Sequence, residues 1–306
     1  MSPVLVIAGP TAVGKSSLAH RVARRLGAEI VSADSRQLYR GLDIGTAKPT
    51  PSEQSEVPYH VLDALPLGVR CSAGRFLERA KLAITDVQSQ GLPVVVVGGS
   101  TLYVHALVEG IPDVPPIASD LESELMDTVA TPEGAEALYR ELEAADPDAA
   151  TTLDPTKTHR LVRWAGVWRE TGRRPSEVWA AAGHRSVPST LVVLDRPRPD
   201  LYARIDQRVD QMMSAGLLAE AERLLSESED ARRTLEATIG YRELLPVLEG
   251  DRALDEGVRL IKRNTRRYAK RQLTWYRRYP DALWLDAATT DVDALLAAVA
   301  PWPHDL

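Results

Sequence analysis

The sequence predicts an α/β protein in which a parallel sheet is flanked by helices and interrupted by an all-helical insertion domain. Near the N-terminus, short apolar runs alternate with amphipathic helical segments, a pattern typical of parallel sheets. The β signal then stops, only helical patterns follow as far as Pro188, and a strand returns at Thr190–Asp195. The chain, at 306 residues, is also long for one domain. We therefore expect residues 1–114 and 186–306 to form the core and residues 115–185 to form the insertion.

The elements of the first half follow from apolar periodicity. Val4–Ala8 is apolar throughout, as in a strand that is buried on both faces. The strands expected in this half are Val4–Ala8, Glu29–Ala33, His60–Asp63 and Pro93–Val97. The helices expected between them are Gly14–Leu26 and Cys71–Gln90.

The insertion and the C-terminal part are predicted to be mainly helical. Thr158–Thr171 carries apolar residues at helical spacing, and Gly172 is a typical helix end. The Ser119–Glu122 pattern predicts a capping box. Long helices are expected over Asp200–Trp275, followed by a late strand at Ala282–Asp286.

A phosphate-binding loop follows the first strand. The spacing of Gly9, Gly14, Lys15 and Ser16 fits G-x-x-x-x-G-K-[ST], so the expected core is a P-loop NTPase-like sheet. Backbone N–H groups and the helix dipole attract an anion there, Lys15 adds a positive charge, and the Ser16 hydroxyl would ligate Mg²⁺. The predicted cradle consists of Gly9, Pro10, Thr11, Ala12, Val13, Gly14, Lys15 and Ser16.

The residues leave open which phosphorylated molecule this loop holds. A triphosphatase usually has a second acid at a strand end that helps to hold Mg²⁺. The strand ending at Val97 is followed by Gly98 and Gly99, with no carboxylate, and Asp195 stands directly before Arg196. The loop could therefore hold a simple diphosphate. The alternative is the nucleoside triphosphate of a small-molecule or nucleoside kinase.

Asp34 directly follows the second expected strand. In open parallel sheets, ligands bind beyond the carboxyl ends of the strands, which places Asp34 beside the phosphate site. The residue could act as a general base, as a helix N-cap, or as an acid in the outer shell of Mg²⁺.

The chain resembles the tRNA dimethylallyltransferases, also called tRNA isopentenyltransferases. The block DIGTAKP, preceded by Asp34-Ser35, is the most specific match, and the matches run in the family's order almost from end to end. The matching segments are the P-loop, Ile30–Pro49, Val94–Gly110, His159–Glu177, Leu201–Glu220, Ala237–Leu244 and Thr265–Arg278.

This resemblance implies a reaction and a set of catalytic residues. Dimethylallyl diphosphate would donate its five-carbon group to N6 of the adenosine at tRNA position 37, next to the anticodon, and diphosphate would leave. Asp34 would be the general base, Arg208 would contact the diphosphate, and Ser100 would stand where the family usually has Thr. Mg²⁺ is the implied cofactor. Arg204 and Arg208 also have a second interpretation, in which they lie on an exposed face and form salt bridges with nearby acids.

tRNA is the implied partner, although the net charge is −6. Residues 259–278 carry nine Lys or Arg and no Asp or Glu, and such a face repels itself unless an anion is present. The alternative for this basic segment is a solvated charged surface. Tyr241 and Trp275 could stack on bases or simply pack in the protein core. Glu122 stands near where relatives often carry an Arg that touches tRNA. The tRNA contacts implied by the resemblance are Asp34, Ser35, Arg36, Gln37, Ser100, His159, Arg160, Leu161, Val162, Arg163, Gly240, Tyr241, Arg242, Lys270, Arg271, Gln272 and Trp275.

Other properties narrow the class of protein. Cys71 is the single cysteine, which excludes a disulfide framework within one chain. The first apolar run is too short for a signal peptide or a membrane span, so we expect a cytoplasmic protein that does not bind membranes. We expect a monomer. A non-catalytic RNA-binding protein with a relic P-loop is a further alternative.

Overall fold

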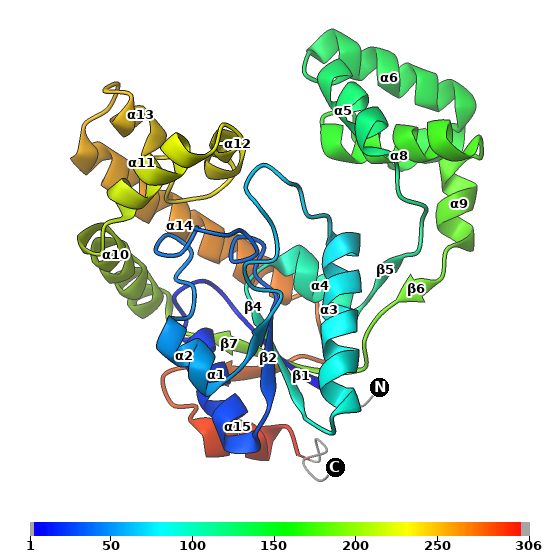
Figure 1. Cartoon of the computed structure of the whole chain (residues 1–306). Helices are drawn as coiled ribbons and strands as arrows, with labels where there is room; N and C mark the ends of the chain where they lie inside the picture. The colour runs from blue at the N-terminus through cyan, green and yellow to red at the C-terminus, as the bar shows by residue number, and fades with distance from the viewer. Residues whose placement is uncertain (1–2, 301–306) are drawn as a thin grey trace. The chain divides into compact units, whose positions relative to one another are not determined.

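The structure, a computed structural model, describes residues 3–300 and confirms the predicted fold class (Figure 1). Six parallel strands form one sheet in the order β3-β2-β4-β1-β7-β8. Contacts divide the described residues into two compact units, one up to Glu109 and from Ser186 onward, the other Gly110–Arg185. The strands of the sheet are β1 Val4–Ala8, β2 Glu29–Ser32, β3 Tyr59–His60, β4 Val94–Gly98, β7 Ser189–Asp195 and β8 Leu283–Asp286.

In the first unit, one face of the sheet is covered by α1, α10 and α15. Leu5 and Ile7 of β1 lie in the same buried cluster as Leu18 of α1, Leu201 of α10 and Leu295 of α15. α3 contacts β2 and β4 and packs against α4, which completes a layered α/β core. The helices of this unit are α1 Lys15–Leu26, α2 Pro51–Glu56, α3 Ala73–Ser89, α4 Thr101–Val108, α10 Arg198–Ser214, α11 Leu217–Glu227, α12 Ala231–Glu236, α13 Leu245–Leu248, α14 Leu254–Tyr276 and α15 Val292–Ala298.

The second unit has its own core, formed by Leu125 of α5, Leu142 of α6 and Leu161 of α8 with their neighbours. A short antiparallel pair, β5 Ile111–Pro112 and β6 His184–Arg185, joins its two ends. Strands of two residues are too short to leave a periodic pattern, which is why the sequence predicted helices alone. The helices of this unit are α5 Ser119–Thr128, α6 Pro132–Ala145, α7 Pro147–Thr152, α8 Thr158–Thr171 and α9 Pro175–Ala181.

Two local predictions were wrong. The strand expected at His60–Asp63 ends at His60, because Val61 and Asp63 have positive φ angles of 60° and 50° that a strand cannot continue. α5 has no capping box, since Ala118 is its N-cap and no side chain caps it. Among residues 3–300, no helix is both long and apolar enough to cross a membrane.

Candidate active site

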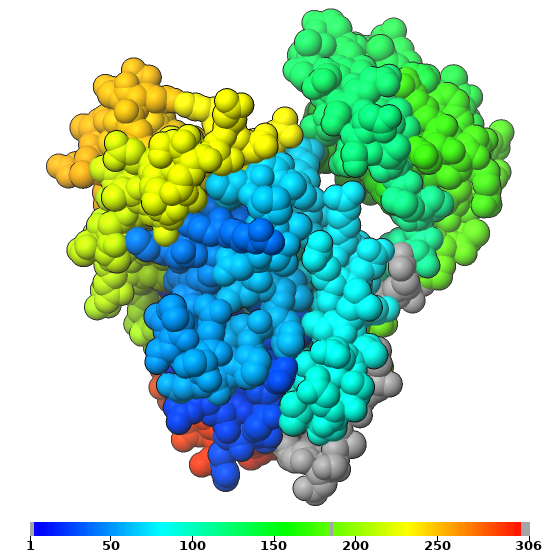
Figure 2. Space-filling model, in the orientation of Figure 1, coloured from blue at the N-terminus to red at the C-terminus, as the bar shows by residue number. Residues whose placement is uncertain are grey.

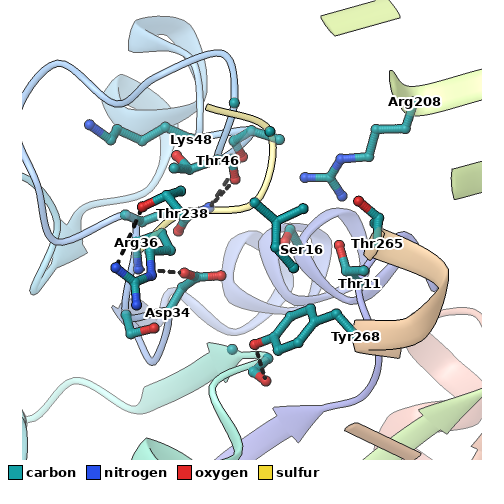
Figure 3. Close-up of a pocket in the computed structure, with 18 of the residues that line it drawn as sticks. Thr11, Ser16, Asp34, Arg36, Thr46, Lys48, Arg208, Thr238, Thr265 and Tyr268 are labelled. Carbon is teal, nitrogen blue, oxygen red and sulfur yellow. Dashed lines mark hydrogen bonds between the residues drawn. The ribbon is translucent and has the colours of Figure 1, made fainter. Parts of the chain in front are cut away.

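A cavity of about 410 Å³ lies in the first unit, where the chain leaves β1, β2 and β4. Its walls come from the P-loop, the turn after β2, Gly45–Pro49, α10, residues 237–242 and α14. Asp34 and Arg208 point into it from opposite sides, with Ser16 between them (Figure 3). A second cavity, of about 910 Å³, shares Lys15, Ser16 and Arg208 with the first.

The P-loop has the geometry of an anion cradle. Gly9 has a φ of 143°, and a Cβ at this position would lie 2.6 Å from the carbonyl oxygen of Leu194, so only glycine fits. α1 begins at Lys15 with no side-chain cap and no acid in its first turn, which leaves its N–H groups available to an anion. Lys15 is buried, and burial lowers its pKa to about 8, with nearby Arg208 adding to the effect and Asp34 opposing it.

Asp34 lies in the turn after β2 with part of its carboxylate unused. The backbone N–H of Arg36 donates to Asp34 Oδ1 at 2.8 Å, which stabilises the turn and aims the side chain. Residues 35–38 form a turn rather than a helix, so the helix N-cap interpretation is wrong. Among the described residues, Asp34 Oδ2 accepts no hydrogen bond, and a carboxylate with a free oxygen beside a cavity can accept a proton.

Arg208 lines both cavities and forms no salt bridge with any described residue. Burial lowers its pKa, while the Asp34 carboxylate acts in the opposite direction. Arg204, one turn earlier, donates from Nε to the carbonyl oxygen of Ala12 at 3.0 Å. The interpretation of this arginine pair as a salt-bridged surface is therefore wrong. Arg208 is therefore a cation at the cavity wall with no salt-bridge partner in the part of the chain that the structure describes.

A buried carboxylate that the sequence analysis gave no role holds the loop over the cavity. Glu220 of α11 accepts the N–H groups of Asp43, Ile44 and Gly45 at 2.9–3.2 Å and the hydroxyl of Tyr241 at 2.5 Å. A Cβ on residue 45 would lie 2.4 Å from the Tyr241 ring, so the loop can pack against this ring only because residue 45 is glycine. In Figure 2, α11 (yellow-green) lies against the blue segment that precedes α2. The one sequence signal was an acid within a largely apolar stretch of helix.

Several predicted contacts surround the cavity, and others lie apart. Ser35, Arg36, Gln37, Gly240, Arg242 and Arg271 line it. Ser100, predicted to be catalytic, is buried just after the lining residue Gly99 and does not line the cavity itself. Lys270 is exposed on α14, and Trp275 is partly buried, with Arg278 4.6 Å from its ring centroid. His159, Arg160 and Arg163 belong to α8 of the second unit.

Four of the predicted tRNA contacts have side chains that are buried within the protein. Leu161 and Val162 belong to the core of the second unit, and Tyr241 is wholly buried against Gly45. Gln272 is 1% exposed, and both ends of its amide bond the protein's own backbone. These side chains are engaged in contacts within the protein.

The second unit presents a different arrangement around Arg163. This residue donates to the carbonyl oxygen of Val114 at 3.3 Å and lies 5.9 Å from the centroid of the Trp179 ring. Burial lowers the pKa of Arg163, and Glu122 opposes that effect. Glu122 is therefore an acid whose charge acts on this arginine.

The basic face of α14 is partly neutralised, which corrects the argument that it must repel itself. α10 packs alongside, and its Asp210 pairs with Lys262 at 2.6 Å. Asp206 pairs with Arg266 at 2.5 Å. Among the described residues, the cations further along α14, Lys270 and Arg271, form no salt bridge and remain available to an outside anion.

A metal would have to rely on few protein ligands. The part of the chain that the structure describes contains no group of three or more His, Cys, Asp or Glu side chains that could hold one. The exposed Ser16 hydroxyl stands at the start of α1 within both cavities. This donor set fits Mg²⁺, which is usually bound by one or two protein oxygens, by phosphate oxygens of the substrate and by water.

Comparisons with known proteins agree on one family. The IPP transferase family matches residues 37–279. A tRNA dimethylallyltransferase from Salinibacter ruber is 45% identical over 295 residues, which cover 96% of this chain and 91% of the relative. The crystal structure of a tRNA delta(2)-isopentenylpyrophosphate transferase from Staphylococcus epidermidis is similar with a TM-score of 0.68 and 31% identity, over 97% of each chain. A eukaryotic dimethylallyltransferase acting on tRNA is similar with a TM-score of 0.80 and 28% identity, over 94% of this chain and 74% of its own.

Proposed function

The chain belongs to the IPP transferase family, whose members transfer a prenyl group onto tRNA, and from this premise we propose a specific reaction for its cavity. The enzyme transfers the dimethylallyl group of dimethylallyl diphosphate to N6 of the adenosine at tRNA position 37. The products are N6-dimethylallyladenosine and diphosphate. The observation that carries the proposal is the free carboxylate oxygen of Asp34 in the same cavity as Lys15 and Arg208, two cations that form no salt bridge with residues 3–300.

The P-loop side of the cavity is the proposed donor site. The N–H groups at the start of α1 bind the diphosphate, and Lys15 contacts it with a charge that anion binding stabilises. Arg208 neutralises the charge that develops as the C–O bond to diphosphate breaks. The Ser16 hydroxyl would hold Mg²⁺, which when bound supplies charge neutralisation to the leaving diphosphate.

Asp34 is the proposed general base. The adenine N6 lone pair is delocalised into the ring, which makes the amine a weak nucleophile. As the N6–C bond forms at the allylic carbon, Asp34 Oδ2 accepts a proton from N6, while the hydrogen bond from Arg36 N–H keeps Oδ1 in place. General-base assistance of this kind typically contributes about 10²–10⁴-fold in rate.

The acceptor enters from the side lined by Arg36, Arg242 and Arg271, according to this proposal. Their guanidinium groups, with exposed Lys270, contact phosphates of the anticodon stem-loop. The target adenine leaves its stack to reach the cavity, which costs a few kcal/mol and is cheapest for an unpaired base. A single chain contains every group used here, so we propose that a monomer suffices. We also propose that the reaction takes place in the cytoplasm, where tRNA is found.

One assay tests this proposal. The protein is incubated with Mg²⁺, labelled dimethylallyl diphosphate and unmodified tRNA transcripts, one with adenosine and one with guanosine at position 37. We expect label in the adenosine transcript only. Labelled ATP and a small-molecule acceptor form the control for a kinase. Phosphate transfer without prenyl transfer, or equal labelling of both transcripts, would contradict the proposal.

A further inference from the structure

Gln272 connects two loops that meet at the cavity. It lies on α14 and is 1% exposed. Its Oε1 accepts the backbone N–H of Thr11 in the P-loop at 2.9 Å, and its Nε2 donates to the carbonyl oxygen of Gly99 at 2.6 Å. The two partners lie 261 and 173 residues away along the sequence, and both line the cavity.

The geometry requires an amide of this length. The backbone N–H of Thr11 can only donate and the carbonyl oxygen of Gly99 can only accept, so the two ends of the Gln272 amide have opposite and fixed roles. A Cβ on Gly99 would lie 2.6 Å from Gln272 Nε2, which shows how closely the backbone approaches the amide. Thr11 follows β1 and Gly99 follows β4, two strands that are neighbours in the sheet. The amide therefore spans the gap between adjacent strand ends.

We propose that Gln272 is a positioning residue that sets the spacing between the donor loop and the acceptor side of the cavity. The inference rests on the proposed function, which places the diphosphate on the P-loop side, where Thr11 lies, and the target amine at Asp34. The segment after Gly99 contacts the turn that carries Asp34, because the Ser100 N–H donates to the carbonyl oxygen of Ala33 at 3.3 Å. Without this amide, the Thr11 N–H loses its acceptor and the Gly99 carbonyl oxygen keeps only the long 3.5 Å hydrogen bond from the Tyr268 hydroxyl, so the two loops are no longer tied to each other. Misplacing reacting groups by about 1 Å can cost about 10²-fold in rate. The loss therefore falls on the chemical step.

A purely structural role makes a different prediction. If Gln272 only stabilised the fold, its replacement would lower the melting temperature and the fraction of active enzyme, but each folded molecule would turn over normally. A direct tRNA contact, in turn, would raise the Kd for tRNA. The positioning role lowers the single-turnover rate per active site and leaves the tRNA Kd within about twofold, since Gln272 is 1% exposed and both ends of its amide already bond the backbone.

The experiment compares Gln272→Met, which keeps the size and removes both hydrogen bonds, with Gln272→Asn, which is too short to reach both loops. Thr274→Ala is the control, because Thr274 is exposed on the same helix and its hydroxyl donates to the carbonyl oxygen of Lys270, one turn earlier. Single-turnover rates at saturating tRNA and donor are divided by the titrated active-site concentration, and the tRNA Kd is measured separately.

We expect a rate loss of about 10–100-fold for Gln272→Met, a smaller loss for Gln272→Asn, and wild-type rates for Thr274→Ala. If Gln272→Met fails to fold, Gln272→Asn alone decides the question. A normal rate per active site, or a loss confined to the tRNA Kd, would overturn the positioning role. Absence of prenyl transfer by the wild-type protein would instead overturn the proposed function.

Discussion

Two carboxylates near the cavity, Asp34 and Glu220, have opposite hydrogen-bond environments. Glu220 is buried and accepts three backbone N–H groups and a tyrosine hydroxyl. Asp34 accepts one N–H and leaves an oxygen facing the cavity. A carboxylate that is saturated with donors serves the fold, because every lone pair is committed before a ligand arrives. One that is unsaturated is available for proton transfer.

The largest expected effect is at Asp34. Asp34→Asn removes the proton acceptor and keeps the shape, so the single-turnover rate should fall by about 10²–10⁴-fold while the tRNA Kd and the melting temperature change little. Asp86→Asn, on the exposed side of α3, is the matched control. Equal losses in tRNA binding and in rate would indicate that Asp34 is structural.

Glu220 should show the reverse pattern. In Glu220→Gln, the amide NH₂ faces backbone donors, so we expect the free energy of unfolding to fall by about 1–3 kcal/mol. The rate per active site should fall far less than in Asp34→Asn. Denaturant unfolding and active-site titration measure the two quantities. A variant of normal stability and greatly reduced rate would reverse the assignment of these two carboxylates.

The same contrast exists along α14, between cations that are paired and cations that are free. Replacing Lys270 and Arg271 by Gln should weaken tRNA binding and flatten the plot of log Kd against log salt by roughly 0.7–0.9 per lost phosphate contact. Replacing Lys262 and Arg266, which pair with Asp210 and Asp206, should change the slope less. Identical slopes for the two double variants would contradict the distinction.

The smallest effect concerns pH. In the free protein Lys15 loses its proton near pH 8, so the affinity for a non-reactive diphosphate analogue should fall as pH rises through about 8, by at most about tenfold per pH unit. The pKa of Lys15 in the folded state lies below the ordinary value of 10.5, so the buried charge lowers the stability of the protein below about pH 8. This loss of stability disappears as the pH rises from about 8 to 10.5. Calorimetric titrations from pH 7 to 9 measure the affinity. Lys15→Met should remove this pH dependence, and an unchanged profile in that variant would exclude Lys15 as its source.

Sequence reasoning worked best where local chemistry is decisive. The apolar runs predicted β1, β4 and β7 to within a residue or two, and the P-loop spacing placed Lys15 and Ser16 correctly at the start of α1. It failed where partners are distant. Nothing around Lys262 or Arg266 in the sequence shows the acids of α10 that neutralise them. Gln272, surrounded by cations, was grouped with the tRNA contacts although its amide is buried.

The sequence by itself determined the parallel α/β class, the family and the anion cradle, because apolar periodicity and short motifs act over a few residues of backbone. Only the tertiary structure decided which polar groups are free to act. That choice depends on contacts between segments more than a hundred residues apart, such as Glu220 with Ile44 and Gln272 with Thr11. A buried polar side chain takes its role from the partners that surround it, and packing alone selects those partners.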